Sequence, residues 1–365
     1  MKASEFNFER YRDYYEKTQK NLLDFDSNRV RRLMVAQRPS ATHFGVDSHT
    51  KEDSLSAQLD SLNEAMMLHG DLSFNYLTPW HGVGVFATAF GAKVKWYPHT
   101  SMQTLCCYDD VEEVADVPYP DIAKCEYLQM ILDTIRYFRD QTGDAIPISL
   151  TDTQSPNDTA SLILDASALF EASLDEPEAL QDFLGKVTRL IQEFSDLEIE
   201  TIGEGNASFP GHQMFSDPSF RGISLSDDNM AVISPASYRD SSLAFNQQLG
   251  RHFHGAAMHS CGVSKHNLSQ LFEIDHLKIF ECAVGYGDKE APTDPNPNSA
   301  ADLLPWFADK DVTLKVRVGP KEIERVFPLL TPRVKLQIEL CTYGTVDERN
   351  RQYDEAMEIM LQHYK

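Results

Sequence analysis

The amino-acid sequence predicts an α/β fold, and within that class a (β/α)8 barrel of the TIM type. Three observations favour it. Short β-rich runs alternate with helical patterns from about residue 140 onward, nearly every run ends in polar or reactive residues, and 365 residues suffice for one such barrel. The alternation alone also fits an open doubly wound sheet. The run ends favour the barrel, because it gathers many strand ends at one mouth, whereas an open sheet spreads them along an edge.

Two regions are predicted along the chain. Residues 1–70 look helical and are expected to form an N-terminal extension or cap, and residues 71–365 are expected to form the barrel. The predicted strands of the second region are AIPISLTDTQ, GISLSDD, GAAMHSCG, LKIFECAVG, VTLKVRVG and VKLQIELCTYG. The helical stretches between them include PEALQDFLGKVTRLIQEF, SPASYRDSSLAFNQQLGRHF and PKEIERVFPLL, which open with Pro or Ser-Pro, as first helical turns often do. The segment GYGDKEAPTDPNPN is interpreted as a long functional loop.

The composition narrows the class of protein. A formal net charge of −23 argues against nucleic acid as a partner, because phosphate binding relies on clustered Lys and Arg. Six cysteines in so long a chain do not indicate a disulfide framework. The N-terminus lacks an apolar signal-peptide core, and no window approaches the roughly 18 apolar residues of a membrane helix. We therefore expect a cytoplasmic protein with no membrane partner.

The run GAAMHSCG carries the sharpest chemical signal. His259 and Cys261 are two residues apart, so on an extended segment their side chains point to the same side. Taken alone, the pair is more often a buried His beside a buried Cys. Cys341 ends another predicted strand, and three N and S ligands from strand ends would make a zinc site with one open position. That arrangement is typical of catalytic zinc.

Four further residues at strand ends are candidates for the site. Neighbours on a strand face opposite ways, so only one of Glu281 and Cys282 can face the barrel interior, and we expect Glu281 to do so as a metal ligand. Asp227 and Asp228 are candidate catalytic carboxylates, although capping of the following helix explains them equally well. Arg317 is a candidate clamp for a substrate carboxylate, and an interior salt bridge is an equal alternative.

The sequence resembles the uroporphyrinogen decarboxylase superfamily over roughly residues 75 to 345. The resemblance rests on TDTQSPNDTASLI, ISLSDDNMAVISPASYR, HSCG, TLKVRVGP and a late Cys before Tyr-Gly. The haem-pathway decarboxylases of this superfamily carry an arginine-rich signature of the type MRQAGR near the N-terminus. This chain has LMVAQRP there instead. It is therefore more similar to the second branch, the zinc-dependent cobamide methyltransferases.

The resemblance implies a function and a set of partners. In the methyltransferase branch a His-x-Cys, a distant Cys and a glutamate hold zinc, which corresponds here to His259, Cys261, Cys341 and Glu281. It implies methyl transfer between a corrinoid and a small-molecule thiol that zinc activates. The corrinoid would be a methylcobamide supplied by a partner protein. One alternative is a lyase that decarboxylates a tetrapyrrole or another carboxylated substrate, with Asp227 or Asp228 as the acid. Another is a non-catalytic tetrapyrrole carrier in which zinc only braces the barrel.

Overall fold

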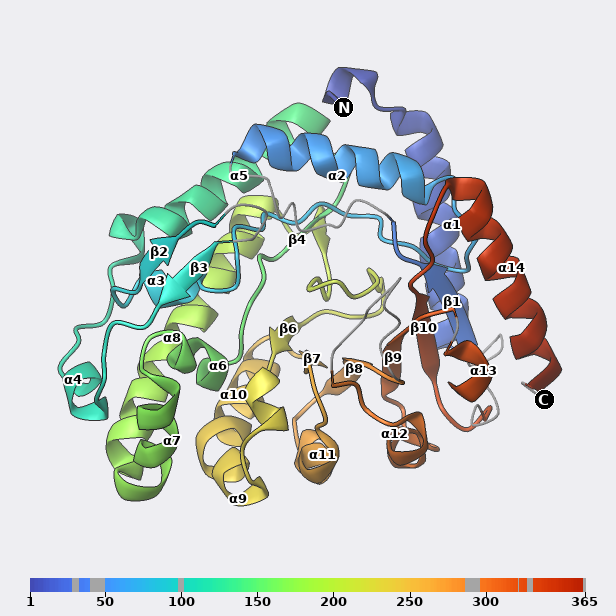
Figure 1. The fold of residues 1–365 in the computed structure, drawn as a ribbon. Helices are drawn as coiled ribbons and strands as arrows, with labels where there is room; N and C mark the ends of the chain where they lie inside the picture. The colour runs from blue at the N-terminus through green and yellow to red at the C-terminus, as the bar shows by residue number, and fades with distance from the viewer. Residues whose placement is uncertain are drawn as a thin grey trace.

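Six parallel strands form the main sheet of the computed structural model, which describes residues 1–27, 33–39, 50–97, 102–285, 296–320, 322–326 and 331–363 (Figure 1). The first strand of the chain pairs with the last along its whole length, so the two ends of the sheet's sequence meet in space. In spatial order the strands are β1 (Leu33–Gln37), β10 (Leu336–Leu340), β9 (Thr313–Val318), β8 (Leu277–Ala283), β7 (Ala256–His259) and β6 (Ile223–Ser226).

Shorter parallel contacts continue this sheet from β1 round to β6. Ala36 of β1 bridges to Leu72, and Leu77 bridges to β4 (Ile148–Ser149). Strand β4 pairs with β5 (Ala207–Ser208), and Gln154 bridges to Ser226 of β6. The ring of parallel contacts is thereby closed, and the predicted TIM-type α/β fold is confirmed. Strands β2 (Lys93–Lys95) and β3 (Gln103–Leu105) form a separate antiparallel pair.

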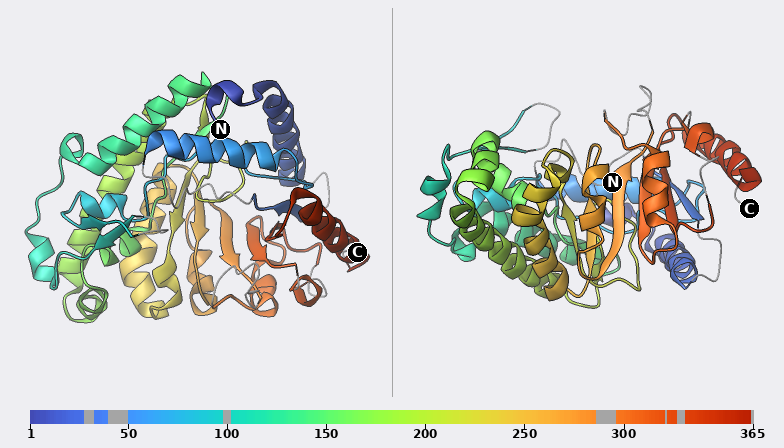
Figure 2. Two further views of the ribbon diagram at one scale, coloured as in Figure 1. Left: turned by 45° about the horizontal axis from the view of Figure 1, so that its top comes forward. Right: turned by 90° about the horizontal axis from the view of Figure 1, so that it is seen from below.

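Helices flank the ring of strands, and those that follow β6, β7 and β8 lie on its outside (Figures 1 and 2). The described helices are α1 (Phe8–Asp26), α2 (Lys51–Ala65), α3 (Val85–Thr88), α4 (Val111–Ala115), α5 (Glu126–Thr142), α6 (Pro156–Ser161), α7 (Ala166–Asp175), α8 (Pro177–Ile202), α9 (Pro235–Tyr238), α10 (Ala244–His252), α11 (Leu268–Leu271), α12 (Ala300–Phe307), α13 (Ile323–Val326) and α14 (Val346–His363). Short helical turns are η1 (Ala3–Glu5), η2 (Ile122–Lys124), η3 (Asp228–Ala231), η4 (Arg239–Leu243, a π-helix) and η5 (Lys265–Asn267). None of these helices is long and apolar enough to cross a membrane.

Local sequence explains where the helices near the site begin. Helix α6 starts with Pro156 directly after Ser155, whose side chain accepts the backbone N–H of Asp158 at 3.1 Å. Helix α9 starts in the same way at Pro235, after Ser234. Pro has no N–H to lose in a first turn, and a Ser before it satisfies an otherwise unpaired donor. The predicted helix over residues 234–253 is interrupted by the π-helical turn η4, which joins α9 to α10.

Strand β1 corrects the prediction for the N-terminal region. Residues 1–70 do contain α1 and α2, but Leu33–Gln37 is a strand of the main sheet and all five of its residues are buried. The prediction of helix throughout is wrong here, because a run of four apolar residues, Leu33 to Ala36, is too short for its periodicity to separate strand from helix. The proposed division into an extension and a barrel stays a prediction.

Charged side chains lie among the buried residues of β9 and β10. Lys315 and Glu339 are completely buried and form an ion pair at 2.5 Å. Arg38, just past the end of β1, also pairs with Glu339. A buried charge is tolerated only with a partner, and Glu339 supplies that partner to both Lys315 and Arg38.

We expect Glu198→Gln to change how stability depends on pH. Glu198 of α8 is fully buried and accepts the backbone N–H of Thr151 at 2.8 Å. Burial raises its pKa from 4.5 to about 8, so the folded protein holds a proton that the unfolded chain releases. The free energy of unfolding of the wild type should therefore fall between pH 4.5 and 8, by up to about 1.4 kcal/mol per pH unit.

Denaturant unfolding of both proteins across this range tests the expectation. The Gln side chain keeps the acceptor for Thr151 and cannot ionise, so the stability difference should widen in favour of the variant as the pH rises. Glu200→Gln, at an exposed position of the same helix, is the matched control and should follow the wild-type curve. A constant difference between wild type and Glu198→Gln across the range would contradict the assignment.

Candidate active site

His259 and Cys261 lie together at the carboxyl end of β7. His259 is the last residue of the strand, and its Nε2 is 3.2 Å from the Sγ of Cys261. Asp228, at the start of η3 after β6, completes a group whose nitrogen, sulfur and oxygen atoms lie within 4.8 Å of one another. Imidazole, thiolate and carboxylate are all ligands of Zn²⁺. The described residues thus bring one donor of each kind to a single point.

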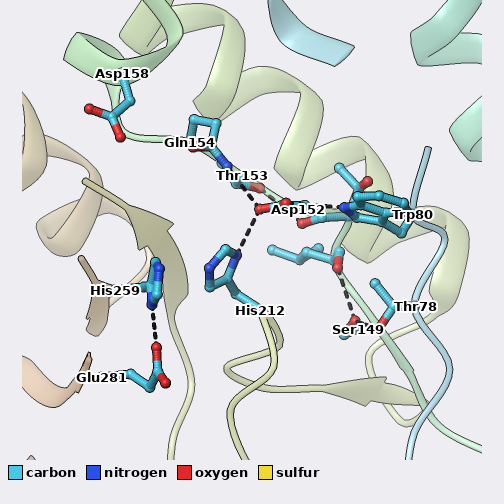
Figure 3. Close-up of polar contacts among 12 residues, drawn as sticks. Thr78, Trp80, Ser149, Asp152, Thr153, Gln154, Asp158, His212, His259 and Glu281 are labelled. Carbon is cyan, nitrogen blue, oxygen red and sulfur yellow. Dashed lines mark hydrogen bonds and ion pairs between the residues drawn. The ribbon is translucent and has the colours of Figure 1, made fainter. Parts of the chain in front are cut away.

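Glu281 faces the barrel interior, but on the other side of the imidazole ring. It is the register partner of His259 across β7 and β8, and its Oε2 contacts Nδ1 of that ring (Figure 3). Arg317 lies 2.8 Å and Lys315 3.5 Å from its Oε1. Burial raises the pKa of Glu281, but these cations and His259 outweigh burial and hold it well below its ordinary value. An ionised Glu281 accepts the Nδ1 proton, which leaves the lone pair of Nε2 toward Cys261.

Cys341 follows β10 directly and is buried. Burial and the nearby charge of Glu339 raise the pKa of its thiol to about 11. Arg317 interacts electrostatically with both Cys261 and Cys341. In the part of the chain that the structure describes, Cys341 is not a member of the group formed by Asp228, His259 and Cys261.

Asp227 and Asp228 have different surroundings. The carboxylate of Asp227 is fully buried and is bound by Tyr238 at 3.0 Å, Asn246 at 2.7 Å and Ser155 at 3.2 Å. Burial raises its pKa to about 6 despite these hydrogen bonds. The side chain of Asp228 is 48 % exposed, at the mouth. Only Asp228 of the two is placed to meet a molecule entering the barrel.

Arg317 is the strand-end residue with unused donors. It lies on β9 and forms an ion pair with Glu281, as the salt-bridge alternative predicted. Its Nη2 is buried and has no hydrogen-bond partner among the described residues. A guanidinium presents donors in a planar fork that matches a carboxylate. The clamp and the salt bridge are therefore compatible roles for this one side chain.

Asp152 and His212 form a buried dyad that the sequence pattern does not predict. His212 Nδ1 lies 2.7 Å from Oδ1 of Asp152 (Figure 3). Gln154 also donates to this Oδ1, and Trp80 donates to Oδ2. The ring of His212 lies 4.9 Å from that of His259, centroid to centroid. Asp152 was visible as a strand-end residue. His212 lies in the irregular segment after β5, at a φ of +46°, where no periodicity reveals a side-chain direction.

The segment GYGDKEAPTDPNPN follows β8. Its residues 286–295 lie outside the described residues, so the interpretation as a functional loop stays a prediction.

Residues 71–205 match the family model described as uroporphyrinogen decarboxylase (URO-D). The resemblance to the uroporphyrinogen decarboxylase superfamily is confirmed. The matched segment contains Asp152 and Asp158, and ends before β5 and before the site residues from Asp227 to Cys341.

Two solved structures were found by comparison of folds, and one of them is similar to this chain. A methyltransferase from Methanosarcina mazei matches with a TM-score of 0.63 and 13 % identity, over 94 % of this chain and 98 % of that one. The two chains share a fold over nearly their whole lengths. L-Rhamnonate dehydratase from Gibberella zeae covers 82 % of this chain and 56 % of its own at 12 % identity, with a TM-score of 0.27, too low to bear on the fold. Among curated proteins, none matches the sequence.

We expect Asp152→Asn to lower the pKa of His212 by at least about one unit. Burial lowers that pKa, but the charge and hydrogen bond of Asp152 outweigh burial and raise it above 6.5. The stability that His212 contributes is therefore fully present below pH 6.5 and is lost as the pH rises through its higher folded value. An uncharged Asn removes the charge of Asp152, so burial is opposed only by the charges of Glu281 and Asp228 and the pKa should fall.

Histidine ring signals followed by NMR against pH measure this, with His212→Gln to assign the resonance. Asp196→Asn is the matched control, because Asp196 pairs with the half-exposed His252 at 2.9 Å, away from the barrel interior. The signal of His212 should titrate as in the wild type in that control. An unaltered titration of His212 in Asp152→Asn would refute the dyad.

Proposed function

We propose that this chain is a zinc-dependent methyltransferase that moves a methyl group between a corrinoid and a thiol. The observation that carries the proposal is the convergence of His259 and Cys261, 3.2 Å apart between Nε2 and Sγ at a strand end. The donor set fits Zn²⁺, because an imidazole nitrogen and a cysteine sulfur are borderline-soft ligands and a carboxylate lies beside them. The likeness to a methyltransferase fold is in keeping with it.

Glu281 supports the proposal through its place behind the ring. Histidines that bind metals usually donate their other N–H to a carboxylate, which fixes the ring and its tautomer. Glu281 accepts the Nδ1 proton of His259 and is itself held by Arg317 and Lys315. In these contacts Glu281 orients the ring of His259. The resemblance assigned Glu281 and Cys341 as ligands, and their direct ligation stays an expectation from sequence.

The chemistry follows from the acidity of thiols. Only the thiolate is a strong nucleophile, and an ordinary thiol is mostly protonated at neutral pH. Bound Zn²⁺ would lower the pKa of an acceptor thiol and keep it deprotonated. In the transfer the sulfur forms a bond to the methyl carbon, the cobalt–carbon bond breaks, and its electron pair stays with the corrinoid. The thiol proton leaves to solvent. A separate protein would present the methylcobamide at the mouth.

A carboxy-lyase is the second candidate, and one observation favours it. The buried Nη2 of Arg317 has no hydrogen-bond partner in the described structure, so a substrate carboxylate would satisfy it. Asp227 or Asp228 would then supply the proton. A tetrapyrrole or another carboxylated compound is the substrate class of this alternative. A non-catalytic carrier of such a compound would use the same arginine.

We expect His259→Ala and Cys261→Ser to abolish zinc binding and methyl transfer together. Purified wild type should hold close to one zinc per chain, measured by plasma mass spectrometry, and should transfer methyl from free methylcobalamin to a small thiol. Each variant should lose at least about 100-fold in transfer rate while keeping its circular dichroism. His252→Ala, which removes a half-exposed histidine of α10, is the matched control and should retain both properties.

Three outcomes would contradict the proposal in different ways. Wild type without zinc after chelator-free purification would remove the metal. Decarboxylation that persists in His259→Ala would favour the lyase. Unfolding of both variants with no methyl transfer by the wild type would favour a structural metal in a carrier.

A further inference from the structure

Asp228 lies close to His259 and Cys261, the two zinc ligands of the proposed function. Its Oδ1 is 3.7 Å from Nε2 of His259, and it accepts the backbone N–H of Cys261 at 2.6 Å. Tetrahedral Zn²⁺ with ligand bonds of about 2.0–2.3 Å separates its donor atoms by roughly 3.3–3.8 Å. The separations of Nε2 from Sγ, 3.2 Å, and from Oδ1, 3.7 Å, are close to that range. The donor atoms of Asp228, His259 and Cys261 all lie within 4.8 Å of one another, so the carboxylate is placed for the third corner.

A buried carboxylate from another element holds Asp228 in place. Asp158, in the first turn of α6, accepts the backbone N–H groups of Asp228 and of Asn229, the latter at 2.9 Å. Asp158 is buried, and its contacts tie the start of η3 to α6. Two hydrogen bonds to consecutive amides fix the backbone from which the Asp228 side chain extends. The backbone at Asp228 is therefore already ordered in the folded protein, so metal binding would cost less conformational entropy.

The two neighbouring carboxylates, Asp227 and Glu281, bind other side chains. Asp227 is fully buried and bound by Tyr238, Asn246 and Ser155. Glu281 lies on Nδ1 of His259, across the ring from Cys261. Asp228 alone of the three combines proximity to Nε2 with 48 % exposure at the mouth. Its exposed side leaves room for a fourth ligand from the substrate.

We propose that Asp228 is a metal ligand and that this chain binds zinc through one imidazole, one thiolate and one carboxylate. The inference rests on the proposed function for the presence of zinc, and it changes the expected ligand set by placing Asp228 where the resemblance put Cys341. Its chemical consequence concerns the kind of donor atom. A carboxylate oxygen in place of a second cysteine sulfur would leave the charge of that ligand unchanged and would give the metal one harder donor.

Binding of Zn²⁺ and Co²⁺ to the full-length protein tests the proposal without any activity assay. Competition with a chelating dye gives the zinc affinity, and Co²⁺ reports thiolate ligation in the near ultraviolet and coordination geometry in the visible. Asp228→Ala should weaken zinc binding at least about 100-fold. It should keep the thiolate band of Cys261 and change the visible bands. Asp228→Glu should restore much of the affinity.

Matched variants separate the possible ligands. Asp240→Ala removes an exposed aspartate of η4 and should bind zinc as the wild type does. Cys341→Ser should also retain zinc. Asp228→Asn keeps an oxygen that can accept the Cys261 N–H, so it should fold even where Asp228→Ala does not, and should bind zinc more weakly than the wild type.

The results distinguish this inference from the proposed function. Unchanged affinity in Asp228→Ala and Asp228→Asn, with loss in Cys341→Ser, would overturn the role of Asp228 and leave the methyltransferase standing with its expected ligands. Wild type that binds neither ion would overturn both. Loss in the Asp228 variants alone, with zinc retained in Cys341→Ser, would establish the mixed ligand set.

Discussion

The carboxylate of Glu281 lies between the imidazole of His259 and the cations of Lys315 and Arg317, inside the barrel. A lone ionised carboxylate could not be buried there, because the desolvation penalty would exceed any gain. Lys315 and Arg317 stabilise the charge, and Glu339 in turn pairs with Lys315. The orientation of His259 depends on this arrangement, since a neutral Glu281 would no longer hold the proton on Nδ1. The proposed binding of zinc at the mouth depends on that orientation.

The sheet register places the residues of this arrangement beside one another on neighbouring strands. His259, Glu281 and Lys315 are partners across β7, β8 and β9, and Arg317 and Glu339 are partners across β9 and β10. A slip of one residue in β8 would turn Glu281 outward and place Phe280 or Cys282 against the histidine. The geometry at the ring is therefore set by backbone pairing. Asp228, by contrast, is carried by a turn whose position depends on side-chain contacts from α6.

The barrel could be predicted from the sequence because its strands end in polar residues, and a barrel brings such strand ends together. The proximity of His259 and Cys261 could also be predicted, because alternate residues of a strand lie on the same side. Three features needed the structure. The run of β1 is too short to show a period, and the direction of His212 depends on an irregular segment. The choice between Asp227 and Asp228 is made by η3, where strand alternation no longer applies, and by Tyr238 and Asn246, which the π-helical turn η4 brings to the same carboxylate.

Pairing of β1 with β10 has a consequence for synthesis on the ribosome. Strand β1 is translated long before its partner, Leu336–Leu340. A nascent chain must keep this buried strand with one open edge until β10 has emerged, and exposed strand edges invite aggregation. Glu339 arrives with the same strand, so Lys315 gains its closest anion only then. A chain truncated before β10 would leave Lys315 with Glu281, at 3.5 Å, as its anionic partner, and Glu281 is already shared with Arg317 and His259.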